Sequence, residues 1–420
     1  MKLLREILNH PLAKNFFVYS FGALFLKGVS FLLLPLYTSL LSPAEYGVLD
    51  LLSTFSNILD VSLSIGLLSV IMIEYFHFDD SQRSKLFNNV LSVFLTISSA
   101  LYLIALTFVL IFREKLFPGT QITLLVLVTA TSYLTFFQSF IVLILKQQEK
   151  SRLVTTVQIL SGSVSILLNV LFVYGWSWGI SGIIWSGFIG VVGFSIYSWY
   201  YIIKKIGFSF HFDKAIAIQY LKLGLPFVPN ALLLWLMTSA NRWILLNYNS
   251  LEEVGYYSVA FKFSSLFEPL IIQPFLGAYT PRILKRFKTG DYEQPLRKIA
   301  LIGIPGFIVA GFAVQFIAQW MIDPAFTPSL TLIPVLLFAN YFSLMAQVSA
   351  YILVFQKRII PMLFAISSAA VIGVICNFIL VPIYGGMGSA IAGNISGLVW
   401  FGITFFLQKR ERAKLYSNGL

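Results

Sequence analysis

Six charged side chains lie inside long apolar runs of this chain, where their chemistry suggests binding of an ion or an anionic group. Three are cations and three are carboxylates, namely Lys27, Arg242, Lys262, Asp50, Asp60 and Glu268. A charge inside a run of membrane length costs about 2.5–3.5 kcal/mol on insertion scales, so it normally faces a bundle interior or a wet cavity. Lysine would hold a phosphate-like group as a point charge, and arginine would hold it through two parallel hydrogen bonds. The carboxylates could pair with these cations, or exchange a proton or another cation.

Each charge also has a structural interpretation. Arg242 lies near one end of its apolar run and could extend its side chain to the membrane surface, whereas Lys27 lies too deep for that. Lys262, Asp60 and Glu268 could form a buried ion-pair network that holds two parts of the chain together. The residues alone leave both interpretations open.

Two polar stripes carry most of these charges. The first consists of Asp50, Ser53, Thr54, Asn57, Asp60 and Ser64. At about 100° per residue these positions fall within roughly 120° of one helix face. Four of them recur 208 residues later as Ser258, Lys262, Ser265 and Glu268. We therefore expect two equivalent helices, each with a polar face toward water or substrate.

Composition places the elements that carry these residues in a membrane. Of 420 residues, 58% are hydrophobic and 11% are charged, whereas about 25% are charged in soluble proteins. Apolar runs follow one another almost from end to end, which predicts an all-α, polytopic membrane protein. We expect twelve transmembrane helices, over residues 15–41, 46–73, 86–112, 120–145, 153–173, 178–203, 223–247, 254–280, 299–320, 328–354, 359–381 and 386–407.

The basic residues predict the orientation of these spans. Of the 29 Lys and Arg residues, 24 fall in segments on one side of the predicted spans, and only Arg113 and Lys115 fall on the other. By the positive-inside rule both termini are cytoplasmic. The net charge of +12 is then a property of topology and of contact with anionic lipids, which argues against nucleic acid as a partner.

Histidine and cysteine offer little metal chemistry. The single cysteine, Cys376, excludes a disulfide within the chain and a cysteine-based metal site. His10, His77 and His211 fall in short segments between apolar runs, where solvated histidines are the usual finding. We expect no metal and no cofactor.

The two halves of the chain resemble each other at an offset of 208 to 210 residues. The matches are Glu45-Tyr46-Gly47 with Glu253-Val254-Gly255, Asn169 with Asn377, Tyr174-Gly175 with Tyr384-Gly385, and Ser186-Gly187 with Ser396-Gly397. Six spans per half is an even number, so both halves enter the membrane in the same direction. We expect two parallel-repeat six-helix bundles, residues 1–210 and 211–420, with a site between them near the middle of the membrane.

Four stretches of the sequence together resemble one family. They are SPAEYG after the first span, the Asn241-Arg242 pair, EEVGYYSVAFK at the start of the eighth span, and YGGMGSAIAGNISG at the last turn. On these the chain resembles the Wzx-type polysaccharide (O-unit) flippases of the multidrug/oligosaccharidyl-lipid/polysaccharide exporter superfamily. The resemblance implies a V-shaped fold like that of MATE transporters. Many members have Asp before this arginine, so Asn241 argues against proton coupling at that position.

The resemblance also implies a function and a set of site residues. The family moves undecaprenyl-diphosphate-linked sugars across the bacterial cytoplasmic membrane by alternating access, for surface polysaccharide assembly. We expect Lys27, Arg242 and Lys262 to hold the diphosphate, and Asp50, Asp60 and Glu268 to pair with them or to couple transport to an ion. Polar candidates for the glycan are Asn57, Gln138, Asn340, Ser343 and Gln347, each of which could instead make an interhelical hydrogen bond.

Two other functions stay open. A multidrug exporter of the same superfamily would have the same architecture. A membrane polymerase or glycosyltransferase acting on lipid-linked sugars would usually need a large outer loop or a carboxylate pair, but the predicted outer turns are short, with scattered carboxylates. We therefore expect a transporter rather than an enzyme, with membrane lipids, a glycan polymerase and a ligase as partners.

Overall fold

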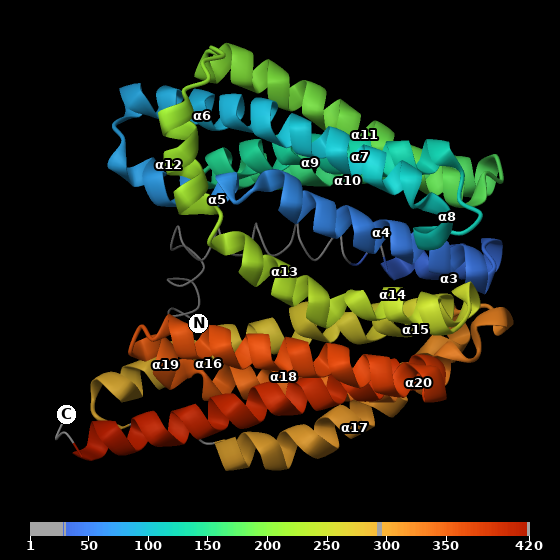
Figure 1. Cartoon of the computed structure of the whole chain (residues 1–420). Coiled ribbons are helices and arrows are strands. Elements are labelled where there is room, and N and C mark those ends of the chain that lie inside the picture. The colour runs from blue at the N-terminus through green and yellow to red at the C-terminus, as the bar shows by residue number, and fades with distance from the viewer. Residues whose placement is uncertain (1–27, 29–30, 292–295, 418–420) are drawn as a thin grey trace, which may run out of the picture. The chain divides into compact units, whose positions relative to one another are not determined.

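The computed structural model describes residue 28, residues 31–291 and residues 296–417. Within these ranges the regular structure is helical and no strand occurs, as Figure 1 shows. The all-α prediction is confirmed. Lys27 and most of the predicted span 15–41 lie outside the described residues.

The described helices account for the predicted spans from the second onward. Eight helices are long and apolar enough to cross a membrane, and two bent helix pairs raise this to ten. The last of the eight holds two predicted spans, since α20 (Ile359–Ser417) contains a break at Gly385, where φ is 54°. The chain is therefore a multi-pass membrane protein.

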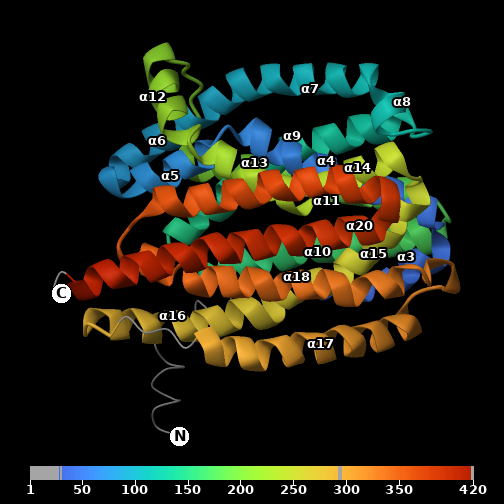
Figure 2. The ribbon, with the colours of Figure 1, turned by 60° about the horizontal axis from the view of Figure 1, so that its bottom comes forward.

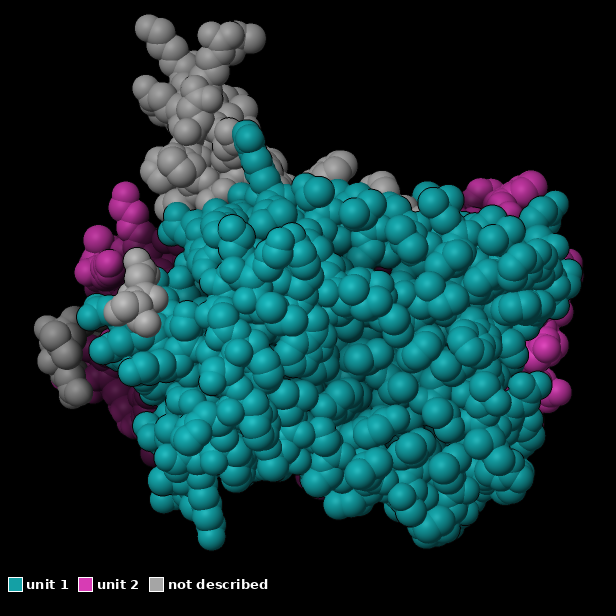
Figure 3. Space-filling view, turned by 90° about the horizontal axis from the view of Figure 1, so that it is seen from above, with its two compact units in different colours: residues 1–36, 51–232 teal, residues 37–50, 233–420 magenta. Residues whose placement is uncertain are grey.

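The chain divides into two compact units, coloured separately in Figure 3. Unit 1 contains the described residues up to Leu36 together with Leu51–Leu232, and unit 2 contains Tyr37–Asp50 and Leu233–Leu420. The short segment Tyr37–Asp50 thus belongs with the second half of the sequence. The repeat boundaries at 210 and 211 stay a prediction.

Unit 1 is built around α9. Its helices are α5 (Leu67–Glu74), α6 (Asp80–Val93), α7 (Ser99–Ile111), α8 (Arg113–Leu116), α9 (Ile122–Gln147), α10 (Ser151–Val170), α11 (Gly179–Tyr201) and α12 (Lys214–Gly224), with most of α4 (Pro43–Ser64) and the start of α13 (Phe227–Thr238). The rings of Phe94 and Phe136 stack with centroids 3.5 Å apart. Phe137 and Phe140 are buried beside them, so one face of α9 forms an aromatic core.

The second predicted span bends where glycine allows it. The axes of α4 and α5 differ by 52°, and Ile65 and Gly66 between them both have positive φ. A Cβ at Gly66 would overlap the backbone of Gly224 at the end of α12. Gly66 is therefore required both by its backbone conformation and by the close approach of α12.

Unit 2 is built around α18, which packs against α15, α17 and α20 (Figures 1 and 2). Its helices are α14 (Ala240–Tyr248), α15 (Leu251–Ser265), α16 (Gln273–Lys288), α17 (Leu296–Met321), α18 (Ser329–Ser349), α19 (Tyr351–Phe355) and α20, with most of α3 (Leu34–Leu40), the first turns of α4 and the end of α13. Leu337, Tyr341, Leu344 and Val348 on α18 are buried in its core. The predicted span 223–247 begins at the end of α12 and continues through α13 and α14, which are separated at Ser239.

The first turns of α4 and α15 pack glycine against glycine inside unit 2. A Cβ at Gly47 would overlap the carbonyl oxygen of Leu251, and a Cβ at Gly255 would overlap the carbonyl oxygen of Pro43. Gly47 and Gly255 are equivalent in the predicted repeat, and so are Pro43 and Leu251. The contact is therefore reciprocal, and it brings the residue one turn after Gly47, Asp50, against α15.

Candidate functional site

A buried ion pair lies at this contact. Arg242 Nε donates to Asp50 Oδ2 over 2.9 Å, and the Ser258 hydroxyl donates to the same oxygen over 2.7 Å. The Arg242 side chain is 3% exposed and that of Asp50 is 14% exposed. Asp50 and Ser258 occupy equivalent positions of the two polar stripes, so the repeat places the carboxylate of one stripe on the hydroxyl of the other.

Arg242 makes further contacts through its Nη1 atom and through the face of its guanidinium. Its Nη1 donates to the backbone carbonyl of Thr238 and, over 3.0 Å, to Asn241 Oδ1. Because the backbone N–H of Arg242 bonds to Ser239 at the helix break, the Thr238 carbonyl is available to the guanidinium. The Phe261 ring lies 4.2 Å from the guanidinium carbon. Arg242 therefore packs inside unit 2, and its predicted role toward substrate stays a prediction.

Asn241 is buried beside this ion pair. Its Nδ2 donates to the hydroxyl of Tyr257 over 2.5 Å while its oxygen accepts from Arg242. The amide therefore bridges α14 and α15. A neutral side chain satisfies both contacts here without adding a second carboxylate next to Asp50.

Lys262 lies one helical turn after Ser258 on α15, within electrostatic reach of Asp50. Its ammonium makes no hydrogen bond or ion pair with another residue in the described part of the chain. Oδ2 of Asp50 is already engaged by Arg242 and Ser258. Lys262 is thus a half-buried cation whose ammonium could pair with an anionic ligand.

Three predicted site residues belong to unit 1. Asn57 is exposed on α4, and Gln138 is half-buried on α9. Asp60 is half-buried on α4, and its Oδ1 is buried without a hydrogen-bond partner among the residues described. Its proposed pairing with Lys27 involves a residue outside the described ranges.

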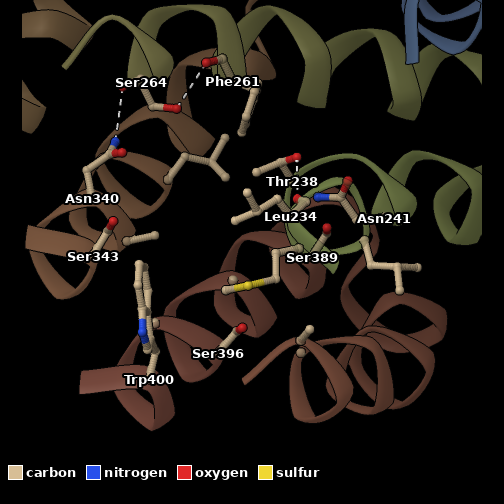
Figure 4. Close-up of a pocket in the computed structure, with 18 of the residues that line it drawn as sticks. Leu234, Thr238, Asn241, Phe261, Ser264, Asn340, Ser343, Ser389, Ser396 and Trp400 are labelled. Carbon is tan, nitrogen blue, oxygen red and sulfur yellow. Dashed lines mark hydrogen bonds between the residues drawn. The ribbon is translucent and has the colours of Figure 1, made fainter. Parts of the chain in front are cut away.

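A pocket of about 460 Å³ lies inside unit 2, between α13, α14, α15, α18 and α20, and Figure 4 shows it at close range. Four predicted residues line it: Glu268, Asn340, Ser343 and Gln347. Asn340 Nδ2 donates to the Ser264 carbonyl over 3.0 Å, and Gln347 Nε2 donates to the Ser343 hydroxyl over 3.2 Å. The structure therefore gathers these four side chains at one cavity, three from α18 and Glu268 from the π-helical turn that follows α15.

Other lining residues were not singled out from the sequence as binding residues. They include Thr238, Asn241, Asn377, Ser389, Ser396 and Trp400, most of them labelled in Figure 4. Asn377 and Ser396 were visible only as repeat matches of Asn169 and Ser186. Their recurrence in the repeat indicates a shared packing position and does not predict the pocket around Asn377 in unit 2.

Charge in the pocket comes from one carboxylate, since Glu268 is the sole charged residue among those that line it in the described structure. The π-helical turn Glu268–Ile272 brings Gln273 beneath Glu268, and Gln273 Nε2 donates to its carboxylate over 2.6 Å. Among the described residues no cluster of three His, Cys, Asp or Glu side chains could hold a metal ion. The pocket is thus polar, mostly uncharged, and acidic at one point.

The architecture is shared with transporters of the MOP superfamily. An inward-facing multidrug resistance MATE family transporter of this superfamily matches with a TM-score of 0.72 and 16% identity, over 94% of this chain and 96% of that one. The lipid II flippase MurJ, in an inward closed conformation, matches with a TM-score of 0.74 and 17% identity, over 96% and 90%. MATE in the bent conformation matches with a TM-score of 0.60 and 16% identity, over 100% and 99%. These likenesses confirm the predicted MATE-like fold.

The sequence of the chain also matches a known protein family. No curated protein matches the chain. The model of one family, described as polysaccharide biosynthesis protein, matches residues 12–287, which is more than half of the chain and includes Asp50, Arg242, Lys262 and Glu268. With the resemblance read from the sequence confirmed in this way, the chain belongs to the polysaccharide biosynthesis protein family.

Proposed function

We propose that this protein is a flippase that moves polyprenyl-diphosphate-linked oligosaccharide units across the bacterial cytoplasmic membrane by alternating access, for surface polysaccharide assembly. Membership of the polysaccharide biosynthesis family supports a role in glycan assembly. The fold, which is similar to that of a lipid II flippase and of MATE transporters, supports movement of a substrate through the membrane. In this proposal both termini are cytoplasmic, and the protein makes and breaks no covalent bond. Its partners are membrane lipids, a glycan polymerase and a ligase.

One observation carries the proposal: Lys262, a cation without a partner among the described residues, lies next to a pocket that is polar and mostly uncharged. Lys262 sits in α15 between Phe261 and Ser264, which both line the pocket. An ammonium can hold a phosphate as a point charge, and amide and hydroxyl groups suit sugars. Unit 2 therefore offers adjacent groups for the two chemically different parts of a lipid-linked glycan.

The three predicted cations have different proposed roles. Lys262 and Lys27 are the residues that we propose to hold the diphosphate. Arg242 would have to release Asp50 before it could join them, because its guanidinium is buried in the ion pair. We propose that Asn340 and Gln347 contact the glycan in unit 2, and that Asn57 and Gln138 do so from unit 1.

The carboxylates are proposed to couple transport to an ion. Asp60 has an unpartnered, buried oxygen among the described residues, and Glu268 lies on the pocket. When a lysine partner of either carboxylate binds the substrate instead, that carboxylate could take up a proton or a metal cation. Such an exchange would keep the sites neutral through the cycle.

A second candidate function is export of a cationic drug. Glu268, the charged residue of the pocket lining, would attract a cationic amphiphile. The ammonium of Lys262, which has no partner in the part of the chain that the structure describes, would repel the same ligand, and this favours the anionic lipid-linked substrate.

Deletion of the gene in its host cell tests the proposal against this alternative. We expect loss of surface polysaccharide and accumulation of lipid-linked units that a membrane-impermeant sugar oxidant cannot reach in intact cells. Normal polysaccharide with raised sensitivity to cationic drugs would contradict the flippase and support the exporter.

A further inference from the structure

We infer that the pocket in unit 2 is a subsite for an uncharged sugar residue of the glycan, separate from the group that binds the diphosphate. The inference rests on the proposed function and adds to it the chemical class of sugar. Its basis is the hydrogen-bonding polarity of the lining, its aromatic wall and its charge.

Three amides of the lining each donate one hydrogen bond to the protein, and no bond to their oxygens is found among the described residues. Asn340 Nδ2 donates to Ser264, Gln347 Nε2 donates to Ser343, and Asn377 Nδ2 donates to the Gly373 carbonyl over 2.8 Å. Three hydroxyls of the lining also donate hydrogen bonds to backbone carbonyls, namely those of Thr238, Ser264 and Ser396. The oxygens of these three amides are therefore acceptors that a ligand with hydroxyl donors would satisfy.

Asn377 is the lining residue whose amide oxygen most clearly needs a hydrogen-bond donor. The residue is 8% exposed, and its Oδ1 has no hydrogen-bond partner among the described residues. A buried acceptor without a donor is costly to leave unsatisfied. Asn377 lines the pocket, and in this inference a sugar hydroxyl, the donor that a glycan supplies, completes the hydrogen bonding of its amide.

The aromatic wall suits the flat face of a sugar ring. Trp400 lines one side of the pocket opposite the labelled polar residues of α13 and α15 (Figure 4). An indole offers an apolar, electron-rich face to the C–H groups of such a ring. The volume of about 460 Å³ lies in the range of ligand pockets, roughly 300–1,000 Å³.

Charge excludes the diphosphate and acidic sugars from this place. No cation lines the pocket in the described structure, while Glu268 does. The carboxylate accepts hydrogen bonds from hydroxyls but repels uronate or phosphate groups. The sugar in the pocket is therefore neutral, and the diphosphate binds at the lysines outside it.

Cysteine accessibility tests this assignment. The protein carries Cys376→Ser and Ser343→Cys, and the purified chain in lipid nanodiscs is labelled with a maleimide at the introduced thiol. The ligands are neutral oligosaccharides released by mild acid from the lipid-linked glycans of the host, inorganic pyrophosphate, and tetraphenylphosphonium. We expect the oligosaccharides to slow labelling and the other two to leave its rate unchanged. Protection by pyrophosphate, protection by the cation alone, or no protection by the oligosaccharides overturns the inference.

A matched pair of variants identifies the contact. Asn377→Leu removes the unpartnered acceptor, and we expect the concentration of oligosaccharide that gives half protection to rise up to about tenfold, the loss of one hydrogen bond. Asn169→Leu is the control, since Asn169 is its repeat equivalent, equally buried with an unpartnered Oδ1, and does not line the pocket. Equal effects of the two variants would show a packing role and contradict the inference.

The outcome is distinguishable from that of the deletion experiment. Protection by free oligosaccharide needs neither lipid nor transport, so it can succeed where the flippase proposal fails. Conversely, a flippase without protection at Ser343→Cys would leave the proposed function standing and overturn the subsite.

Discussion

The guanidinium of Arg242 lies 2.9 Å from the carboxylate of Asp50, across 192 residues of sequence. The pair joins the first turns of α4 to α14 inside unit 2, and Ser258 of α15 completes it. Both partners are taken from water, so the pair depends on hydrogen bonds from its neighbours for its stability. Arg242 is therefore first a structural residue of unit 2, whatever part it takes in transport.

Breaking this pair should destabilise the protein. We expect Asp50→Asn to cost about 3–5 kcal/mol in the free energy of unfolding, because Arg242 stays buried without its counter-charge. The double variant Asp50→Asn/Arg242→Gln should recover much of the loss. Thermal unfolding in detergent measures both, and Arg286→Ala, which removes the exposed pair with Asp291, is a control expected to change stability by less than about 1 kcal/mol. Wild-type stability of Asp50→Asn would contradict this account of the pair.

The glycine contact between α4 and α15 leaves no room for a methyl group. Gly47→Ala and Gly255→Ala should each lower stability by about 1–3 kcal/mol, because the added Cβ meets a backbone carbonyl that cannot move aside. Gly402→Ala on α20 is the control, since nothing lies within 4 Å of its added Cβ. If all three variants unfold at the same temperature, the helices do not approach as closely as described.

The lysines should matter for transport rather than for folding. We expect Lys262→Ala and Lys27→Ala to abolish glycan export at normal protein abundance, and Lys27→Arg to retain part of it. Surface polysaccharide is measured against membrane abundance of the protein. Lys285→Ala removes an exposed cation of α16 and should export normally. Normal export by Lys262→Ala would remove this residue from the site.

Asp60 and Glu268 separate ion coupling from structural pairing. If they couple transport to an ion, Asp60→Asn and Glu268→Gln should each lose export while keeping normal abundance. If Asp60 only neutralises Lys27, the single variant should be scarce, because a buried cation is left unpaired. In that case Asp60→Asn/Lys27→Gln should restore abundance. Scarce single variants with a restored double variant would rule out coupling at Asp60.

The orientation in the membrane can be read with reporter fusions. Fusions after Leu41, Phe112, Gly175, Tyr248, Asp323 and Gly385 should report the outside, since 24 of the 29 basic residues lie in segments assigned to the inside. Fusions after Glu149 and Lys288 are the inside controls. Cytoplasmic activity at two or more of the six outer positions would be incompatible with the twelve-span topology.

Much of the fold could be predicted from the sequence, because membrane spans are local. A helix in lipid must satisfy its own backbone hydrogen bonds and expose apolar side chains, so composition over about 20 residues identifies it. The run of leucines and valines in α9, the paired stripes of α4 and α15, and the Gly385 turn were all visible in this way. The family resemblance was also visible, because its motifs are short, continuous stretches of sequence at turns and helix starts.

The tertiary structure decided which polar residues meet. The stripe that holds Asp50 and Asp60 on one helix face is divided, because Asp50 belongs to unit 2 and Asp60 to unit 1. Arg242, placed by the sequence at the end of an apolar run, is instead buried by the break at Ser239 and the approach of α4. Asn377 and Trp400 become pocket residues only because α20 folds against α14 and α18. Spacing along one helix specifies a face, but the partner of that face depends on side chains hundreds of residues away, and their packing exists only in the folded chain.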